Sequence, residues 1–507
     1  MSMSGPLLLG VDIGTGSSKA VLTDVDGAVL HTAFRAHGTS MPRPGWFEAD
    51  AEGMWWAEVV ALCRDLLAEA GSGDVAALCV SGVGPALVLT DSDLRPLRPA
   101  ILYGIDTRAE QQIDELTARY GEEQIFQTCG KVLSTQALGP KLRWVQLNEP
   151  EVWAKARYWF GASSFIVAKL CGEYVLDRHT ASQCDPMYDL REQTWTSWAT
   201  DICGHLPLPR LAWPTEVVGH VTTEAAQQTG LLAGTPVVAG TVDAWAEGFS
   251  AGARRPGDLI LMYGSTMFFV QVLSSMRTHR LLWTTAGVEP GSLTVAAGMS
   301  TSGTLTNWVK ALTGDPPFED LVAEAAAVPP GSGGLVLLPY FAGERTPVFD
   351  PRARGVLAGL SLQHTRGHLF RAAYEGIAFG IRQIVDILEE GVEPPRRIFA
   401  VGGGTKGGLW TQIVSDVTGR EQRVPAQTIG ASYGDALMAA IGIGIVPPET
   451  DWAELSSIVI PNRLHADRYD SLYRLYRELY PATRAVVHQL AAIQAGDVPS
   501  SGAGLPG

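Results

Sequence analysis

Residues 7–30 read LLLGVDIGTGSSKAVLTDVDGAVL, and the order of patterns in this stretch decides the fold. An apolar run is followed by a glycine-rich turn at residues 14–16, an alternating stretch over residues 19–22, an Asp-Gly turn and a further apolar run. This order predicts a β-hairpin extended by a third strand. The common phosphate loops need glycines that open a helix, whereas these glycines open a strand. We therefore expect a tight turn that presents its N–H groups and the Thr15 hydroxyl to a phosphate.

Asp12 interrupts the first apolar run just before this turn. Burying a carboxylate is costly unless it is paired or lies near a metal ion. Two interpretations follow: Asp12 is a metal-binding group beside the phosphate turn, or a structural hydrogen-bonding residue.

A second informative stretch is residues 235–249, TPVVAGTVDAWAEGF. Its apolar start predicts a short buried strand, Gly240 breaks it, and a helix is expected from Ala244. Asp243 then lies at the joint between strand and helix. Such a carboxylate is either the helix N-cap or a functional group at the end of a strand, and the two roles do not exclude each other.

Both patterns occur again further along the chain. Residues 257–270, GDLILMYGSTMFFV, predict another strand, Gly-Ser-Thr turn and strand, and residues 397–418 predict a strand, a glycine cluster and a helix. The repeated order indicates a duplicated α/β architecture with a ligand cleft between the halves. A nucleotide would place its phosphates on both hairpin turns, with residues 402–404 allowing close approach of the base or ribose.

A third candidate segment is residues 97–108, LRPAILYGIDTR, which predicts a strand with a polar tip at Asp106 and Arg108. Strand ends are where α/β sheets place ligands. The same two residues are also an ordinary surface ion pair, so both interpretations stay open.

Composition excludes several classes of function. The net charge of −15, without a basic cluster, argues against nucleic acid or an anionic membrane as a partner. The six cysteines contain no C-x-x-C pair, which indicates reduced thiols and a cytoplasmic protein. No stretch has the length of a membrane span or the pattern of a signal peptide. Composition does not give the oligomeric state, for which a homodimer is our working expectation.

The chain resembles the FGGY family of carbohydrate kinases, which belongs to the actin-like superfamily. The sharpest match is GVLAGLSLQHTRGHLFRAAYE at residues 355–375, which fits the family's C-terminal signature at every constrained position. The family's N-terminal signature expects Ser, Thr or Pro three residues before Lys141, and this chain has Leu138 there. Four further segments resemble the xylulokinase branch in particular: PGWFEAD from residue 44, LRPAIL from residue 97, KLRWVQLNEP from residue 141 and PYFAGERTP from residue 339.

The resemblance implies two actin-like (ribonuclease H-like) α/β domains, with ATP and Mg²⁺ as cofactors. In matching positions, Asp243 would be the catalytic base that takes the proton of the sugar hydroxyl, and Asp12 would help to hold Mg²⁺. The nucleotide-binding positions implied in the same way are Thr15, Gly264, Ser265, Thr266, Gly303, Asn307, Gly403, Gly404 and Thr405.

The substrate loop departs from the family pattern. Xylulokinases usually carry Gln-Met-His where this chain has Val83, Gly84 and Pro85, and glycerol kinases carry Arg-Glu near it. We expect Gly84, Pro85, Asp106 and Asp243 to contact the sugar. The reaction expected is ATP-dependent phosphorylation of a small ketose or polyol, with D-xylulose first and ribulose, erythritol or glycerol as alternatives.

Other classes of function are an actin-like ATPase and a sugar sensor without kinase activity. The first would not need the complete C-terminal signature, and the second would be expected to lack one of the two acids. A DNA-binding regulator would need a basic helix-turn-helix before the first hairpin, where only six residues stand. We place the domains at residues 1–244 and 245–490, and expect residues 491–507 to be a disordered tail.

Overall fold

The computed structural model describes residues 5–71, 74–427 and 429–495, and the chain forms two compact units. The first unit comprises residues 1–256, 272–295 and 429–454, and the second comprises residues 257–271, 296–428 and 455–507. These units differ from the predicted division at residue 244 in that residues 272–295 and 429–454 are grouped with the first unit, and the predicted domain bounds stay a prediction. The predicted tail is corrected in part, since α16 (Ala466–Gln494) includes residues 491–494, while residues 496–507 lie outside the described ones.

The first unit is built on a six-stranded sheet with the order β13-β14-β5-β1-β2-β3. β1 pairs antiparallel with β2 and parallel with β5, and β14 is parallel to β5. The predicted hairpin and third strand are thus confirmed. The strands are β1 (Leu7–Ile13), β2 (Ser17–Thr23), β3 (Val29–Ala36), β5 (Val75–Gly82), β13 (Val217–His220) and β14 (Pro236–Val238).

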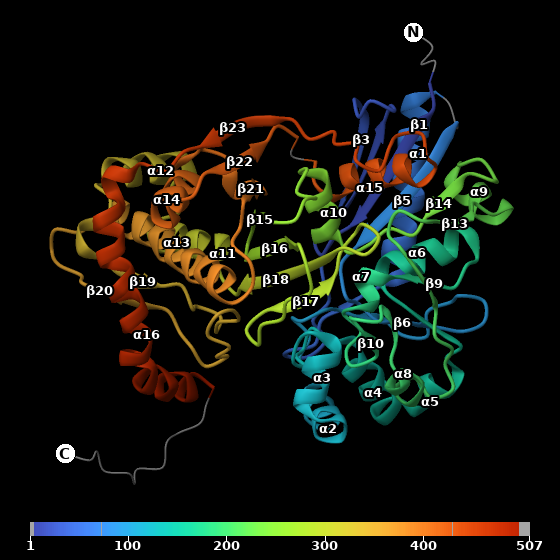
Figure 1. Ribbon diagram of the computed structural model, residues 1–507, viewed down its shortest axis with the longest axis horizontal. Coiled ribbons are helices and arrows are strands. Elements are labelled where there is room, and N and C mark those ends of the chain that lie inside the picture. Colours follow the sequence, from blue (N-terminus) through green and yellow to red (C-terminus); the bar gives the residue numbers. More distant parts are fainter. Residues whose placement is uncertain (1–4, 72–73, 428, 496–507) are drawn as a thin grey trace. The chain divides into compact units, whose positions relative to one another are not determined.

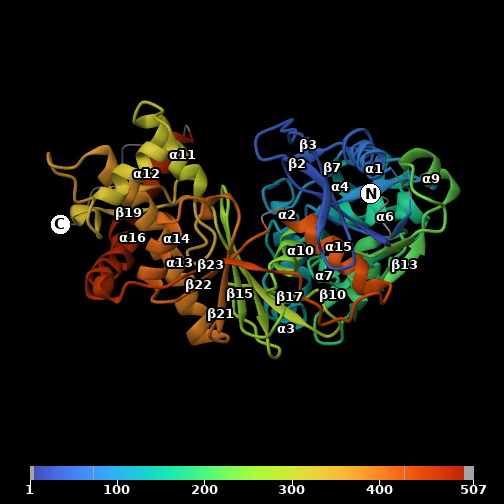
Figure 2. The same ribbon diagram turned by 90° about the horizontal axis from the view of Figure 1, so that it is seen from above.

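Helix α15 (Ala431–Gly442) belongs to this unit although it lies near the end of the sequence. It packs on β1 and on α10 (Asp243–Ser250), as Figures 1 and 2 show. Glycines permit the close approach: a Cβ on Gly10 would lie 1.8 Å from the Ser432 carbonyl oxygen, and one on Gly434 would lie 2.1 Å from that of Ala246. No larger residue fits at either position without moving a backbone.

The remaining elements of the first unit surround this sheet. Residues 109–234 contain eight helices, α2 to α9, together with six short strands, β8 to β13. Helix α1 (Ala57–Ala70) precedes this segment. The eight helices within it are α2 (Glu110–Tyr120), α3 (Glu122–Cys129), α4 (Leu138–Asn148), α5 (Pro150–Lys155), α6 (Ala162–Cys171), α7 (Arg178–Ala181), α8 (Ser197–Cys203) and α9 (Thr223–Thr229). The short strands within the segment are β8 (Tyr158–Phe160), β9 (Val175–Asp177), β10 (Tyr188–Asp189), β11 (Thr194–Trp195), β12 (Arg210–Ala212) and β13, which was given above. Four further short strands of the first unit lie outside the segment: β4 (Glu48–Ala49), β6 (Val88–Thr90), β7 (Ala100–Ile101) and β17 (Trp283–Ala286).

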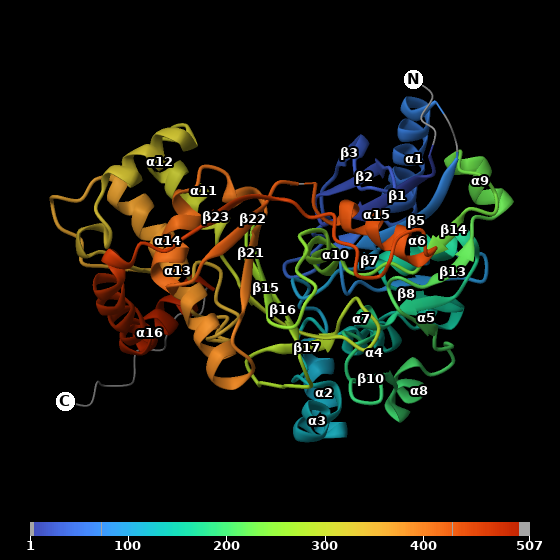
Figure 3. The same cartoon turned by 45° about the horizontal axis from the view of Figure 1, so that its top comes forward.

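The second unit contains a mixed sheet with the strand order β18-β16-β15-β21-β22-β23. The hairpin of β15 with β16 and the later strand and helix, β21 with α14, confirm the predicted repeat. The long helix α13 packs against α12 and α14, and Figure 3 shows the three together. The elements are β15 (Asp258–Tyr263), β16 (Met267–Leu273), β18 (Leu293–Met299), β19 (Val336–Leu338), β20 (Val356–Ala358), β21 (Arg397–Val401), β22 (Gln422–Pro425), β23 (Leu455–Val459), α11 (Gly303–Leu312), α12 (Phe318–Ala327), α13 (Arg366–Gly391), α14 (Leu409–Thr418) and α16.

Two further sequence expectations concern the whole chain. All six cysteines are free thiols, five of them buried. Among the described residues, no helix combines the length and apolarity that crossing a bilayer requires.

Candidate active site

Three parallel strands of the first unit end at one edge of the sheet and bring the candidate residues together. Asp12, near the end of β1, is in register with Ser81 near the end of β5. Beyond β14, Val242 forms a parallel bridge with Gly82, so that Asp243 follows at the same edge. Carboxyl ends of parallel strands are where open α/β sheets bind ligands. The topology therefore explains why two acids 231 positions apart in sequence lie at the same edge of the sheet.

The joint before α10 is tightly held, but Asp243 is not its N-cap. Val242 occupies the N-cap position without a side-chain cap, and among the described residues the Asp243 carboxylate accepts a hydrogen bond only from the adjacent Ala244 N–H, at 2.7 Å. The N-cap interpretation is therefore wrong. The Thr241 hydroxyl donates to the buried Asp177 carboxylate at 3.0 Å, which fixes the backbone just before Asp243. The structure thus leaves most of the hydrogen-bonding capacity of Asp243 for a ligand.

Asp12 is buried among other charges. Burial raises the pKa of Asp12 well above its usual range, and the negative charges of Asp243 and Glu247 raise it further. Lys19 acts in the opposite direction, and it lies directly across the hairpin from Asp12. Within the described residues, Oδ1 of Asp12 is buried and has no hydrogen-bond partner. Such an atom is costly unless a ligand satisfies it.

Asp243 shares this electrostatic environment. Burial raises its pKa to about 7, the charge of Glu247 adds to the increase, and the Ala244 N–H and Lys19 lower it. Glu247 follows Asp243 by four residues on α10, so both side chains project from one face of the helix. Sequence analysis missed both Glu247 and Lys19. The i,i+4 spacing of the two acids and the opposed positions across the hairpin were visible signals for them.

A further carboxylate, Asp435 on α15, lies behind the sheet edge and is completely buried. It accepts a hydrogen bond from the Ser81 hydroxyl at 2.6 Å and one from the Cys79 thiol at 3.8 Å. Burial, with the charge of Asp12 as a smaller cause, raises its pKa well above the usual range. No sequence pattern near Asp12 could indicate this residue, because α15 reaches β1 only in the folded unit.

The first hairpin turn offers two adjacent backbone donors. The Gly14 N–H bonds to the Ser17 carbonyl at 2.9 Å and closes the turn. The N–H groups of Thr15 and Gly16 have no hydrogen-bond partner in the part of the chain that the structure describes. Successive free N–H groups in a turn form an anion-binding concavity. The geometry thus agrees with the predicted phosphate turn.

The loop at residues 83–85, whose sequence departs from the family pattern, lies next to the joint that carries Asp243. The Val83 N–H donates to the Ile13 carbonyl at 2.7 Å, and a Cβ on Gly84 would lie 2.6 Å from a Val242 methyl carbon. Pro85 is buried. The loop therefore shapes the wall beside Asp243 and offers few side-chain donors there.

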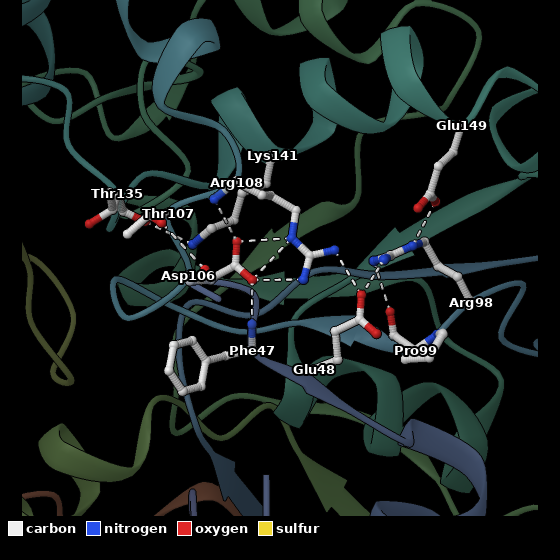
Figure 4. A network of polar contacts seen from close by, with 11 residues as sticks. Phe47, Glu48, Arg98, Pro99, Asp106, Thr107, Arg108, Thr135, Lys141 and Glu149 are labelled. Atoms are coloured by element: carbon white, nitrogen blue, oxygen red, sulfur yellow. Dashed lines mark hydrogen bonds and ion pairs between the residues drawn. The ribbon is translucent and has the colours of Figure 1, made fainter. Parts of the chain in front are cut away.

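Asp106 does not present its carboxylate to a ligand. Its oxygens accept hydrogen bonds from the Arg108 guanidinium at 2.7–3.0 Å and from the Phe47 N–H at 2.7 Å, and its side chain is completely buried (Figure 4). Arg108 continues the network to Glu48 at 2.7 Å and stacks over Trp46. Asp106 and Arg108 therefore form a buried ion pair and not a surface one. The structure also disfavours direct sugar contact, because a sugar could reach Asp106 only if this network came apart.

The hydrogen-bonded network around Asp106 instead adjoins residues 103–104, which reach the first hairpin turn. The Tyr103 hydroxyl lies 3.5 Å from the Thr15 hydroxyl. Thr135 donates its hydroxyl to the Gly104 carbonyl at 2.8 Å, and the Lys141 ammonium donates to the Thr135 carbonyl at 2.8 Å. Burial lowers the pKa of Lys141 to about 7. Tyr103 is thus a site candidate that sequence analysis missed.

The second hairpin turn also offers two adjacent backbone donors. The Gly264 N–H bonds within the turn, and among the described residues no partner is found for the N–H groups of Ser265 and Thr266, which are exposed. The Gly303 N–H donates to the Gly264 carbonyl at 2.9 Å, and a Cβ on Gly303 would lie 2.7 Å from that oxygen. Gly303 therefore supports the turn from behind.

Glu344 in turn supports the segment that leads to Gly303. Its Oε1 accepts hydrogen bonds from the N–H groups of Ser300 at 2.7 Å and Arg345 at 2.8 Å. Burial raises the pKa of Glu344 to about 7, against the effect of these bonds. Glu344, the first residue of the Glu-Arg-Thr-Pro segment, thus holds the backbone at Ser300, just before Gly303 contacts the second turn.

The three consecutive glycines after β21 have different roles. A Cβ on Gly402 would lie 2.8 Å from the Tyr263 carbonyl oxygen, and one on Gly404 would lie 2.7 Å from the Trp410 ring. Only a Cβ on Gly403 would meet no described atom within 4 Å. Packing within the chain thus requires glycine at positions 402 and 404, and close approach of a nucleotide to the three glycines stays a prediction.

The last two nucleotide-binding candidates belong to the same unit. The Thr405 hydroxyl donates to the Gly402 carbonyl at 2.9 Å and so closes the glycine turn. Asn307 is exposed on α11. Both stay predictions as nucleotide contacts.

The first unit fits a magnesium ion held by one carboxylate. In the described residues, no set of three or more His, Cys, Asp or Glu side chains is arranged to hold a metal ion. Mg²⁺ usually keeps several waters and takes only one or two protein carboxylates together with substrate phosphates. The unpartnered Oδ1 of Asp12, beside a phosphate turn, matches this kind of site.

The paired hairpins and the acids at the sheet edge define an actin-like phosphotransferase fold. The sequence matches the N-terminal domain of the FGGY family of carbohydrate kinases over residues 7–249 and the C-terminal domain over residues 259–443. The chain belongs to the FGGY family of carbohydrate kinases.

Individual relatives agree in fold but differ in name. The structure of a xylulose kinase from Rhodospirillum rubrum is 34% identical with a TM-score of 0.88, and the match covers 95% of this chain and 100% of that one. A xylulose kinase from Lactococcus lactis is 29% identical over 95% of this chain and 98% of its own length. A glycerol kinase from Nocardia farcinica is 30% identical over 87% and 92%, respectively. The relatives thus agree on the class of enzyme and not on the sugar.

Proposed function

We propose that this carbohydrate kinase transfers the terminal phosphoryl group of ATP to a hydroxyl of a small ketose or polyol. D-Xylulose, giving D-xylulose 5-phosphate, is the first candidate, and ribulose, erythritol and glycerol follow. The observation that carries the proposal is the sheet edge of the first unit, where Asp243 and Asp12 lie together. The relatives named xylulose kinase support the first choice of sugar.

The chain's own residues have distinct tasks in this reaction. Asp243, whose carboxylate accepts only one hydrogen bond in the described part of the chain, takes the proton from the attacking hydroxyl. The free N–H groups of the two hairpin turns bind phosphate oxygens. Asp12 holds Mg²⁺, which when bound neutralises charge on the phosphates. Phosphoryl transfer depends mainly on such positioning and charge stabilisation.

A coupled assay of ADP release tests the proposal. Purified protein with Mg-ATP is screened over ketopentoses, tetritols, glycerol and hexuloses. We expect ADP release that depends strongly on one or more of these compounds. Absence of sugar-stimulated turnover across the panel would contradict the proposal, and sugar-independent ATP hydrolysis would favour the actin-like ATPase alternative.

We expect the wild-type enzyme to be tolerant among small polyols. The loop at residues 83–85 offers little side-chain hydrogen bonding near Asp243, and Asp106 is committed to Arg108. Discrimination by shape alone separates substrates that differ by one carbon by only about 1–3 kcal/mol. Several substrates should therefore fall within about 100-fold in kcat/KM.

A replacement in the loop tests the same reasoning. Pro85→His adds a donor and should narrow the range of accepted substrates, with the unfolding midpoint measured in parallel because Pro85 is buried. A wild type that prefers one sugar by more than about 10⁴-fold would show that hydrogen-bonding groups elsewhere set the specificity.

A further inference from the structure

The segment that follows β3 holds every carbonyl group of the first phosphate turn. The Gly16 carbonyl accepts from the His37 N–H at 3.1 Å, and the Thr15 carbonyl accepts from the Thr39 hydroxyl at 3.3 Å. The Gly14 carbonyl lies 3.0 Å from Nε2 of the His37 ring. Two residues of one short segment therefore contact three successive peptide groups of the turn.

These contacts determine where the free donors point. A trans peptide group is planar, so its C=O and the following N–H point in opposite directions. The bond from His37 to the Gly14 carbonyl consequently directs the Thr15 N–H away from His37, and the bond from Thr39 does the same for the Gly16 N–H. The Thr15 and Gly16 N–H groups are the two that lack a partner among the described residues. A hydrogen bond accepted by a carbonyl also polarises its peptide group, which makes the attached N–H a better donor.

The His37 ring is itself held by Glu58 on α1. Its Nδ1 lies 2.9 Å from Glu58 Oε2, and the His37 and Glu58 side chains are only 5% and 16% exposed. Both ring nitrogens face acceptors, a carboxylate and a carbonyl. A proton on Nε2 is needed for the bond to Gly14, and the ring donates to both acceptors at once only in the form that carries a proton on each nitrogen. Glu58 therefore fixes the orientation of the ring, with Nε2 directed at the Gly14 carbonyl.

A purely structural role would be to lock α1 onto β3. Two other pairs join the same elements: Arg35 with Asp65, and His31 with Glu69 at 3.1 Å. The pair of His31 and Glu69 has the same chemistry as the pair of His37 and Glu58, yet it is more exposed. Among the described residues, the only hydrogen bond of the His31 ring goes to Glu69. The chain thus contains its own control for the structural explanation.

We propose that His37, oriented by Glu58, is a positioning residue that aims the Thr15 N–H at a phosphate of the nucleotide. The inference rests on the proposed function in one respect, the identity of the ligand as ATP. It adds a residue outside the turn and outside the sheet edge to the nucleotide site. His37 does not touch the substrate in this role; it acts through the Gly14 peptide group.

The test compares His37→Ala with His31→Ala in the full-length enzyme. Loss of one oriented hydrogen bond is expected to raise KM for Mg-ATP about tenfold in His37→Ala, with kcat and the KM for sugar changed less than about threefold. His31→Ala should leave all three constants near wild type. His37→Gln keeps one amide donor and should recover part of the loss. Glu58→Gln should raise the KM for Mg-ATP in the same direction as His37→Ala, by about threefold.

A second measurement does not depend on activity. Amide hydrogen exchange of the ligand-free protein, followed in a peptide that covers residues 10–20, should be faster in His37→Ala than in His31→Ala. Equal exchange and equal KM for Mg-ATP in the two variants would overturn the inference. If His37→Ala does not fold, His37→Gln and Glu58→Gln decide the question by the same two measurements. A wild type without sugar-dependent turnover would defeat the proposed function, and the exchange data would still decide whether His37 positions the turn.

Discussion

Asp243→Asn is expected to lower kcat by at least about 10²-fold, or 2.7 kcal/mol of activation free energy, while leaving ATP binding intact. Asparagine has nearly the same shape and can still accept the hydrogen bond from the Ala244 N–H. It cannot take a proton from a sugar hydroxyl. Steady-state kinetics give kcat, and calorimetric titration with ADP or ATP measures binding.

The stability of this variant separates a catalytic role from a structural one. Burial disfavours the charged form of Asp243, whose pKa is raised to about 7, so a neutral side chain should leave the unfolding midpoint unchanged or slightly higher. Glu247→Gln is the matched control, because it removes a carboxylate one helical turn away on the same face. It should lower kcat much less. A near-wild-type kcat in Asp243→Asn, or an equal loss in both variants, would remove Asp243 from the role of base.

Local sequence patterns predicted the hairpins because these are local structures. Strand, tight turn and strand follow one another within residues 7–23 and 258–273. The backbone N–H groups of both turns that have no partner among the described residues belong to the predicted turns, at positions 15 and 16 and at positions 265 and 266. The joint at Asp243 was also predicted, since Gly240 breaks a short apolar strand. The N-cap assignment was wrong because the helix begins one residue earlier than expected, with Val242 as its cap.

Long-range partners were not predictable from patterns of this kind. Asp435 reaches Ser81 from 354 positions away, and this contact requires α15 to return to the first unit. Asp106 looked like an exposed tip because the partners that bury it, Phe47 and Glu48 through Arg108, lie about 60 residues earlier. For the same reason, the sequence could not show that packing against Tyr263 and Trp410 also requires glycine at positions 402 and 404.

Asp12→Asn is expected to raise the Mg²⁺ concentration needed for half-maximal activity by about 10–100-fold and to lower kcat at saturating metal. The reason is Oδ1 of Asp12, which has no partner among the described residues and which, once the carboxyl group is ionised beside a cation, supplies a negative charge that Asn lacks. The nearby charges of Asp243 and Glu247 raise the pKa of Asp12, so a bound cation also relieves their mutual repulsion. Titration with Mn²⁺, followed by electron paramagnetic resonance, reports metal binding without relying on turnover.

Asp435→Asn provides the comparison for Asp12→Asn, because both remove a buried carboxylate from the same part of the sheet. The Asp435 carboxylate accepts the Ser81 hydroxyl at one oxygen and the Cys79 thiol at the other, so an asparagine can keep the shorter bond from Ser81 and loses only the longer one from Cys79, whereas Oδ1 of Asp12 has no partner among the described residues. Only Asp12→Asn should therefore weaken Mn²⁺ binding strongly. An unchanged metal requirement in Asp12→Asn at saturating ATP, with unchanged Mn²⁺ binding, would mean that Asp12 is a structural residue of β1. An equal loss of metal affinity in both variants would mean that the metal responds to the total negative charge behind the sheet edge, and not to direct contact with Asp12.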